Sequence, residues 1–152
     1  MKEIAGANCP VNTKQVNEIV VRMIAMQVVF LGFAALYFQN PYISALLLVD
    51  FGLRAFGFGQ GSPLRYIAQK TVTHFQLGYK ATNEAPKRFA ATMGFFVITI
   101  FTVLLLFQFL VSAIIVGGIL LLFASLEAGF GICAGCIIYQ KLNAWGLIKV
   151  SL

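Results

Sequence analysis

The feature that most limits the fold of this chain is a long stretch in which charge is almost absent. Between residues 89 and 140 the only charged side chain is Glu127. A helix needs about 20 mainly apolar residues to cross a bilayer, so this stretch is too long for one crossing and suits two joined by a tight turn. We expect the turn near residues 108–112, because the alternative break at Gly117 and Gly118 leaves the later span too short.

The composition of the whole chain is that of a membrane protein. Of its 152 residues, 60% are hydrophobic and 11% are charged, and the mean hydropathy is +0.88. Soluble domains carry about 25% charged residues, so too few polar side chains are present to cover a soluble surface. We therefore expect one all-α integral membrane domain over residues 1–152, a bundle of four transmembrane helices at about 17–38, 42–58, 88–109 and 113–139.

The basic residues fall on one side of this predicted bundle. Lys and Arg occur only within residues 2–22, 54–88 and 141–149, which are the two ends and the loop between the second and third spans. Because cytoplasmic loops carry an excess of Lys and Arg, both termini are expected in the bacterial cytoplasm, below the inner membrane. The net charge of +6 favours contact with anionic lipid. The basic residues do not alternate with aromatic residues as in a nucleic-acid-binding groove, so we expect no nucleic-acid partner.

The loop between the second and third spans predicts a basic amphipathic helix at about 63–80. Apolar residues recur along it at helical spacing, opposite basic and amide side chains. Such a helix is typical of the membrane interface, and a connector packed under the bundle is an alternative that is compatible with it. His74 lies near the polar face with no second ligand at a suitable spacing, so we interpret it as a solvated side chain.

Three charged residues are candidates for a role within the membrane. Asp50 and Arg54 are four residues apart, so they share a helix face and can form an ion pair. Glu127 has no partner within four residues and is expected to point into the bundle, meet Arg54 or Arg22, or be protonated. Charges at membrane depth are costly and therefore indicate function, although a pair that only holds helices together is an equal alternative.

A glycine-rich loop leads from the second span into the predicted interfacial helix. A capping serine and then Pro63 stand at the start of that helix. Backbone of this kind at a helix N-terminus, with Arg54 nearby, favours an anion such as phosphate, a lipid headgroup, sulfate or thiosulfate. A flexible exit from the second span is the alternative, and no nucleotide-binding pattern is present. The candidate anion-binding residues are Gly57, Gly59, Gly61, Ser62 and Arg65.

The chain has three cysteines, and an odd number predicts at least one thiol outside any internal disulfide. Cys9 stands just before a helix start that Asn12 can cap, with Lys14 close by. A thiol in that position is expected to have a lowered pKa, which makes Cys9 the best candidate nucleophile. An ordinary exposed terminal cysteine is the alternative.

The other two cysteines, Cys133 and Cys136, form a C-x-x-C pair in the inner half of the predicted fourth span. The spacing is compatible with metal ligation, persulfide exchange or a disulfide. Their expected position near a helix C-terminus disfavours a thiolate, and Gly131 and Gly135 favour simple close packing instead. On a straight helix Glu127 points away from Cys136, and only a break at a glycine would bring them together.

Four stretches carry a resemblance to a known family: CPVN at 9–12, FGLRAFGFGQGSP at 51–63, EAPKRFA at 84–90 and GICAGCIIY at 131–139. Together they resemble a family of small bacterial four-helix membrane proteins classed as a domain of unknown function. The resemblance implies that Cys9, Cys133 and Cys136 belong to the family pattern. Quinone-linked disulfide-generating enzymes are also four-helix bundles with paired cysteines, but their working thiols face the oxidising side.

The leading hypothesis is thiol or sulfur handling at the cytoplasmic face, by thiol-disulfide or persulfide exchange. Cys9 would attack or receive, Cys133 and Cys136 would form the exchange pair, and the glycine-rich loop would bind an anionic substrate or a cytoplasmic thiol or sulfur-carrier protein. One alternative is a small transporter of a thiophilic ion or reduced sulfur species, lined by Asp50, Arg54 and Glu127 in a homo-oligomer. Another is a structural or lipid-organising protein. The sequence names no cofactor or metal.

Overall fold

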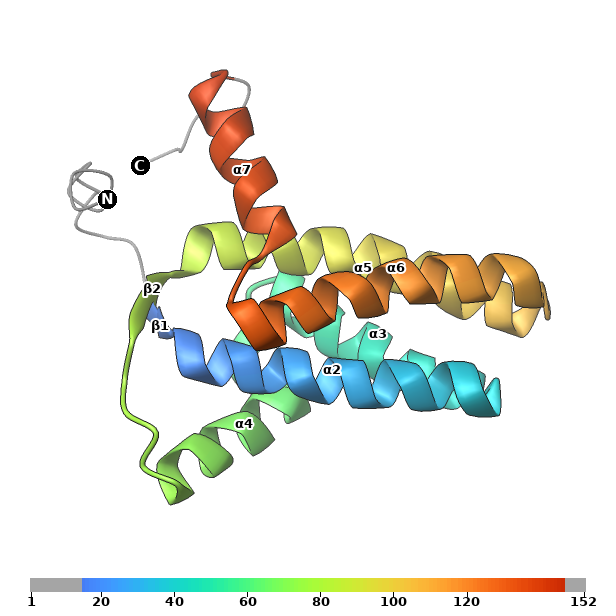
Figure 1. The fold of residues 1–152 in the computed structure, drawn as a ribbon, viewed down its shortest axis with the longest axis horizontal. Helices are drawn as coiled ribbons and strands as arrows, with labels where there is room; N and C mark the ends of the chain where they lie inside the picture. Colours follow the sequence, from blue (N-terminus) through green and yellow to red (C-terminus); the bar gives the residue numbers. More distant parts are fainter. Residues whose placement is uncertain (1–14, 147–152) are drawn as a thin grey trace.

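The computed structural model describes residues 15–146, which form six α-helices, a short 3-10 helix and a two-stranded sheet (Figure 1). The predicted nucleophile Cys9 lies outside the described residues. The all-α prediction is therefore confirmed apart from the small sheet. In chain order the elements are β1 (Gln15–Asn17), α2 (Glu18–Phe38), α3 (Pro41–Ala55), η1 (Gly59–Gly61), α4 (Pro63–His74), β2 (Ala81–Asn83), α5 (Glu84–Leu106), α6 (Leu110–Phe130) and α7 (Ala134–Ala144).

Three of the described helices, α2, α5 and α6, are long and apolar enough to cross a membrane. α3 has 15 residues, and at a rise of 1.5 Å per residue it covers about 22 Å, less than the hydrocarbon core of about 30 Å. The prediction of a membrane protein is confirmed at this level. The second predicted span, 42–58, is a helix that ends at Ala55, and its crossing of the bilayer stays a prediction.

The turns between the long helices follow from their sequences. Gln39 takes a left-handed conformation, and the Asn40 side chain then accepts a hydrogen bond from the Tyr42 N–H at 2.9 Å, with Pro41 at the first helical position. The turn between α5 and α6 is centred on Gln108, with φ of 57°. Both turns lie at or beside their predicted positions.

Glycines allow aromatic rings to fill the space between the helices. A Cβ at Gly94 of α5 would lie 2.5 Å from the Phe51 ring of α3, and a Cβ at Gly117 of α6 would lie 2.7 Å from the Phe101 ring of α5. Phe101 is fully buried, and the outward faces of the same helices remain apolar, as lipid requires. Exposed apolar residues on α5 and α6 include Phe96, Ile115, Ile119 and Leu122, and those on α2 include Phe30 and Phe33.

The charged residues that the structure describes belong to segments at one end of the bundle, where α2 and α5 begin and α3 and α6 end (Figure 1). The sheet holds this end together, because β1 pairs antiparallel with β2 from Gln15 opposite Asn83 to Asn17 opposite Ala81. The Asn17 side chain also accepts from the Ile19 and Lys80 N–H groups. Strands of three residues are too short to show an alternating pattern, so the sequence did not predict them.

The helix predicted at 63–80 is shorter than expected and packs on the bundle. α4 ends at His74 and contacts α2, and its buried residues Leu64, Ala68 and Val72 belong to the hydrophobic core. The structure therefore agrees with the alternative in which this helix is a connector packed under the bundle. Contact of α4 with a membrane surface remains a prediction, which the exposed Tyr66 and Ile67 favour.

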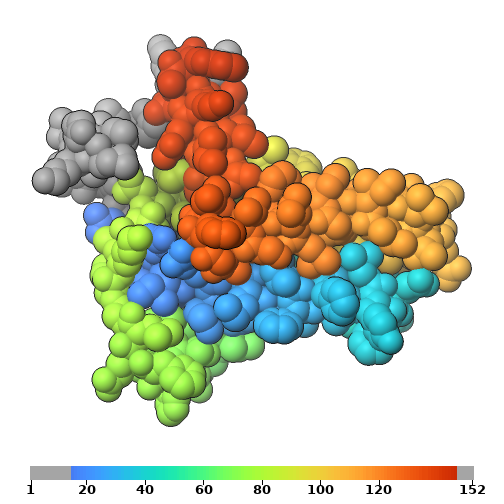
Figure 2. Space-filling model, in the orientation of Figure 1, coloured from blue at the N-terminus to red at the C-terminus, as the bar shows by residue number. Residues whose placement is uncertain are grey.

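The prediction of one continuous helix at 113–139 is wrong, because the helix breaks at Gly131. α6 ends at Phe130, Gly131 is left-handed with φ of 68°, and α7 turns away from the bundle (Figures 1 and 2). A side chain at Gly131 would lie 2.8 Å from the Arg22 guanidinium, so Arg22 occupies the space beside the bend. Glycine is suited to this position, because it adopts a left-handed conformation without steric cost.

Candidate thiol site

The break at Gly131 places the two described cysteines at the start of a helix. Cys133 is the N-cap residue of α7, and Cys136 lies in the first turn. The expectation that the pair lies near a helix C-terminus is therefore wrong. Because the N-terminal end of a helix carries a partial positive charge, this position favours a thiolate instead of opposing it.

The surroundings of the two thiols shift their pKa values in opposite directions. The pKa of Cys133 is lowered mainly because its sulfur accepts a hydrogen bond from the Cys136 thiol. Burial and the negative charge of Glu127 raise this pKa. The Cys136 N–H and the positive charge of Lys87 lower it further. The pKa of Cys136 is raised, first because it donates to Cys133 and then by burial. Neither thiol is in a disulfide. Cys133 is thus the thiol that ionises first, and Cys136 is the proton donor beside it.

Cys133 lines a cavity of about 180 Å³ at the charged end of the bundle. The side chain of Cys133 is 7% exposed, so its sulfur is reached through this cavity and not from an open surface. Most of the lining is apolar, and the exceptions are Arg54, Lys87, Glu127 and Cys133 itself. A small, mostly apolar cavity with a few convergent polar groups is the usual form of a small-molecule site.

Glu127 has a partner that the sequence did not predict. Lys87, near the start of α5, places its Nζ 3.2 Å from Glu127 Oε1. The sequence suggested Arg54 or Arg22, and Lys87 was missed because it lies 40 residues away and just outside the predicted third span. The ion pair places a positive and a negative charge beside Cys133.

α7 is held in place by a close approach to α5. A Cβ at Gly135 would lie 2.6 Å from both Cα and Cβ of Ala90, so the two helices touch at this point. The Phe89 and Tyr139 rings add a contact with 5.5 Å between their centroids. Gly135 therefore acts as a packing residue, as its spacing from Gly131 predicts, while Gly131 itself forms the bend.

Asp50 is fully buried and acts as a cap for α4. Its Oδ1 accepts hydrogen bonds from the Ser62 hydroxyl and from the Leu64 N–H, the latter at 3.2 Å, and its Oδ2 lies 3.9 Å from Arg54 Nη1. The predicted ion pair between Asp50 and Arg54 is therefore present. The sequence did not predict that Asp50 would also bind the helix N-terminus 12 to 14 residues further along the chain.

This arrangement changes the predicted anion site. Ser62 is the N-cap residue of α4 and its oxygen accepts from the Arg65 N–H at 3.3 Å, as expected. Asp50 already supplies the negative charge at this helix end. Gly57 packs under the Arg88 guanidinium and Gly61 borders open space. The loop glycines thus shape the backbone and pack against arginine side chains, because a Cβ at Gly59 would lie 3.2 Å from Arg65 Nη1.

No group of three or more His, Cys, Asp or Glu side chains within residues 15–146 is placed to hold a metal ion. His74 is exposed at the end of α4, and its ring meets the Phe75 ring edge-on.

The chain matches a family model described as a domain of unknown function (DUF4395) over residues 16–144. The matched range includes Cys133 and Cys136 and begins after Cys9. No curated protein and no solved structure matches the chain.

Proposed function

We propose that this chain, which belongs to the DUF4395 family of unknown function, is a membrane protein that carries out thiol exchange through Cys133. The observation that carries the proposal is the position of Cys133 at the N-terminus of α7, facing Cys136 and lining a cavity. A thiol with a lowered pKa and a second thiol three residues later is the arrangement that thiol-disulfide exchange uses.

The exchange proceeds in two steps. The Cys133 thiolate attacks one sulfur of a disulfide partner, which forms a mixed disulfide and releases the other sulfur as a thiolate that takes the Cys136 proton. The Cys136 thiolate then attacks the Cys133 sulfur and releases the second partner thiol. The partner gains two electrons, and the protein keeps a disulfide between Cys133 and Cys136. In persulfide exchange the first step is the same attack on a sulfane sulfur.

The proposed partner is a cytoplasmic thiol or sulfur-carrier protein. The charged end of the bundle supports this, because basic residues prefer the cytoplasmic side of the inner membrane. In this topology α3 is a second, short span and α4 contacts anionic lipid. Cys9 is proposed as an additional attacking or receiving thiol.

A transport role has less support from the described residues. Asp50 binds the N-terminus of α4, and Glu127 is paired with Lys87. Both acids therefore have local partners that explain their presence in the bundle.

The pH dependence of alkylation tests this proposal. In a Cys9→Ser background purified in detergent, the rate of Cys133 modification by iodoacetamide is expected to reach half its maximum below the ordinary thiol pKa of about 8.5. Cys136→Ala removes the main stabilising hydrogen bond and should move this midpoint upward by about one pH unit, a tenfold loss of thiolate near neutral pH. Peptide mass spectrometry measures the rate at each site.

The midpoint of the pH profile is independent of how easily the reagent enters the cavity, so burial does not obscure the result. Cys133→Ser serves as the control that reports Cys136 alone, whose profile should lie at higher pH. A Cys133 midpoint that is ordinary and unchanged by Cys136→Ala would rule out the proposed nucleophile.

A further inference from the structure

A second cavity lies beside the thiol site and contains a pair of arginines. It has a volume of about 70 Å³ and is bordered by β1 and by parts of α2, α3, α4 and α5. Arg54, Lys87, Val21 and Ala91 line both this cavity and the one that holds Cys133. The two cavities are therefore neighbours separated by shared side chains.

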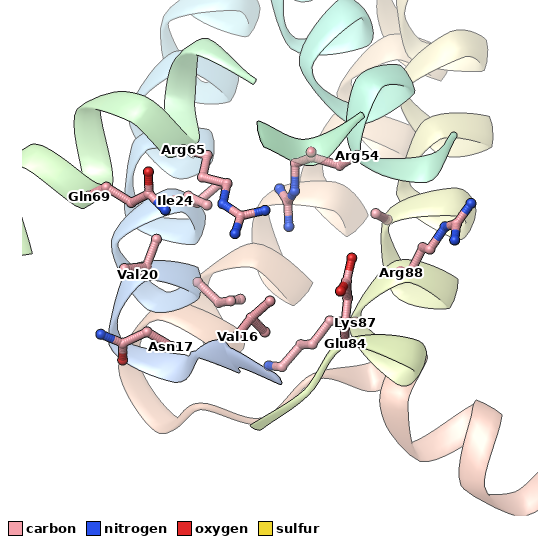
Figure 3. A pocket seen from close by; sticks show the side chains of 13 residues that line it. Val16, Asn17, Val20, Ile24, Arg54, Arg65, Gln69, Glu84, Lys87 and Arg88 are labelled. Carbon is pink, nitrogen blue, oxygen red and sulfur yellow. The ribbon is translucent and has the colours of Figure 1, made fainter. Parts of the chain in front are cut away.

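Arg54 from α3 and Arg65 from α4 extend into this cavity toward one another (Figure 3). In the described part of the chain neither guanidinium makes a hydrogen bond, and Arg65 makes no ion pair. Arg54 Nη1 lies 3.9 Å from Asp50 Oδ2, which is too long for a hydrogen bond, and the Arg54 guanidinium lies over the Phe51 ring, 5.5 Å from its centroid. Two like charges that converge in a partly buried space repel each other unless an anion lies between them.

Apart from Asp50, the charged groups that the structure describes around the cavity form no ion pair with the two arginines. Arg88 points away and donates to the Ala55 carbonyl at 3.2 Å (Figure 3). Lys87 is paired with Glu127. Glu84 is the carboxylate on the cavity wall, and within the described residues it forms no ion pair with either arginine. The remaining polar wall is formed by Asn17, whose side chain is already bonded to the β1–β2 region, and by Gln69.

We propose that Arg54 and Arg65 bind a small tetrahedral oxyanion, of the sulfate, thiosulfate or phosphate class. The planar guanidinium fork matches two oxygens of such a group, and charge-assisted hydrogen bonds are the strong ones. The ligand is either a free anion or the phosphate of a lipid headgroup, since both present the same oxygens. This site differs from the predicted glycine loop, whose helix N-terminus is occupied by Asp50, and it does not depend on the thiol chemistry.

Calorimetric titration of the detergent-purified protein with sulfate, thiosulfate and phosphate, at constant ionic strength in chloride, tests the site. The wild type is expected to bind at least one of them, and Arg65→Gln should weaken that binding about tenfold or more. Lys70→Gln is the matched control, because it removes the same charge from the same helix at a side chain that lies over the Tyr66 ring and not in this cavity.

Native mass spectrometry after reconstitution with phosphatidylglycerol or phosphatidylcholine tests whether the ligand is a lipid headgroup. Retention of phosphatidylglycerol that Arg65→Gln abolishes and Lys70→Gln preserves identifies a headgroup as the ligand. Equal binding of all anions and lipids by the wild type and Arg65→Gln would overturn the proposal. The variant without cysteines should bind the anion as the wild type does, so failure of the thiol proposal and failure of this one are distinguishable.

Discussion

Replacing Asp50 with alanine is expected to lower the free energy of unfolding by about 3 kcal/mol, because breaking a buried ion pair on one side leaves the other charge uncompensated. The change removes the acceptor for the Ser62 hydroxyl and the Leu64 N–H, and it removes the carboxylate that forms an ion pair with Arg54. Equilibrium unfolding in mixed micelles, followed by circular dichroism, measures the difference.

Asp50→Asn separates the contribution of the hydrogen bonds to α4 from the contribution of the ion pair with Arg54. The asparagine keeps an oxygen for the N-terminus of α4 but removes the charge opposite Arg54, so its stability should lie between the wild type and Asp50→Ala. Ser125→Ala is a control of similar size, since its hydroxyl only donates to the Leu121 carbonyl within one helix. A value for Asp50→Ala within about 0.5 kcal/mol of the wild type, the range of ordinary surface substitutions, would show that Asp50 is not a structural cap.

Gly135→Ala is expected to lower the free energy of unfolding by about 2 kcal/mol and to expose Cys133. The added Cβ would lie 2.6 Å from the Cα of Ala90, and overpacking against backbone costs about 1–3 kcal/mol. α7 must then move away from α5, which opens the cavity wall next to Cys133. Mixed-micelle unfolding measures the first effect, and the rate of Cys133 alkylation at a high, fixed pH measures the second.

Gly129→Ala is the matched control for this prediction. A Cβ at Gly129 meets no atom within 4 Å, and alanine is the better helix former by about 1 kcal/mol. Gly129→Ala should therefore leave stability unchanged or raise it, and Cys133 should stay protected. If the two variants behave alike, α7 is not positioned by its contact with α5.

The general architecture could be predicted because it depends on local composition. The uncharged stretch at 89–140, the turn at Asn40 and Pro41, and the capping serine before Pro63 are visible in short segments of sequence. The family assignment was also predicted from short motifs and is confirmed. These features need no information about which helix packs on which.

The site depended on contacts that no short segment reveals. Gly131 is one of several glycines in an apolar run, and only the packing of Arg22 beside it distinguishes a bend from a helical glycine. Asp50 finds its partners in another helix, and Lys87 meets Glu127 across 40 residues. The bend places the cysteine pair at the N-terminus of α7. The sequence predicted a helix C-terminus there, and therefore the opposite effect of the helix dipole on the thiols.

The small sheet at the charged end has a consequence for how the protein assembles. Its two strands belong to segments more than 60 residues apart, and the Glu18 N–H donates to the Lys80 carbonyl at 2.8 Å in the same region. Closing a loop of that length is entropically costly until α3, which contacts both α2 and α5, has brought the two segments together. The strands therefore pair only after the hairpin of α2 and α3 has met α5, and protection of their amides from hydrogen exchange marks a completely inserted molecule.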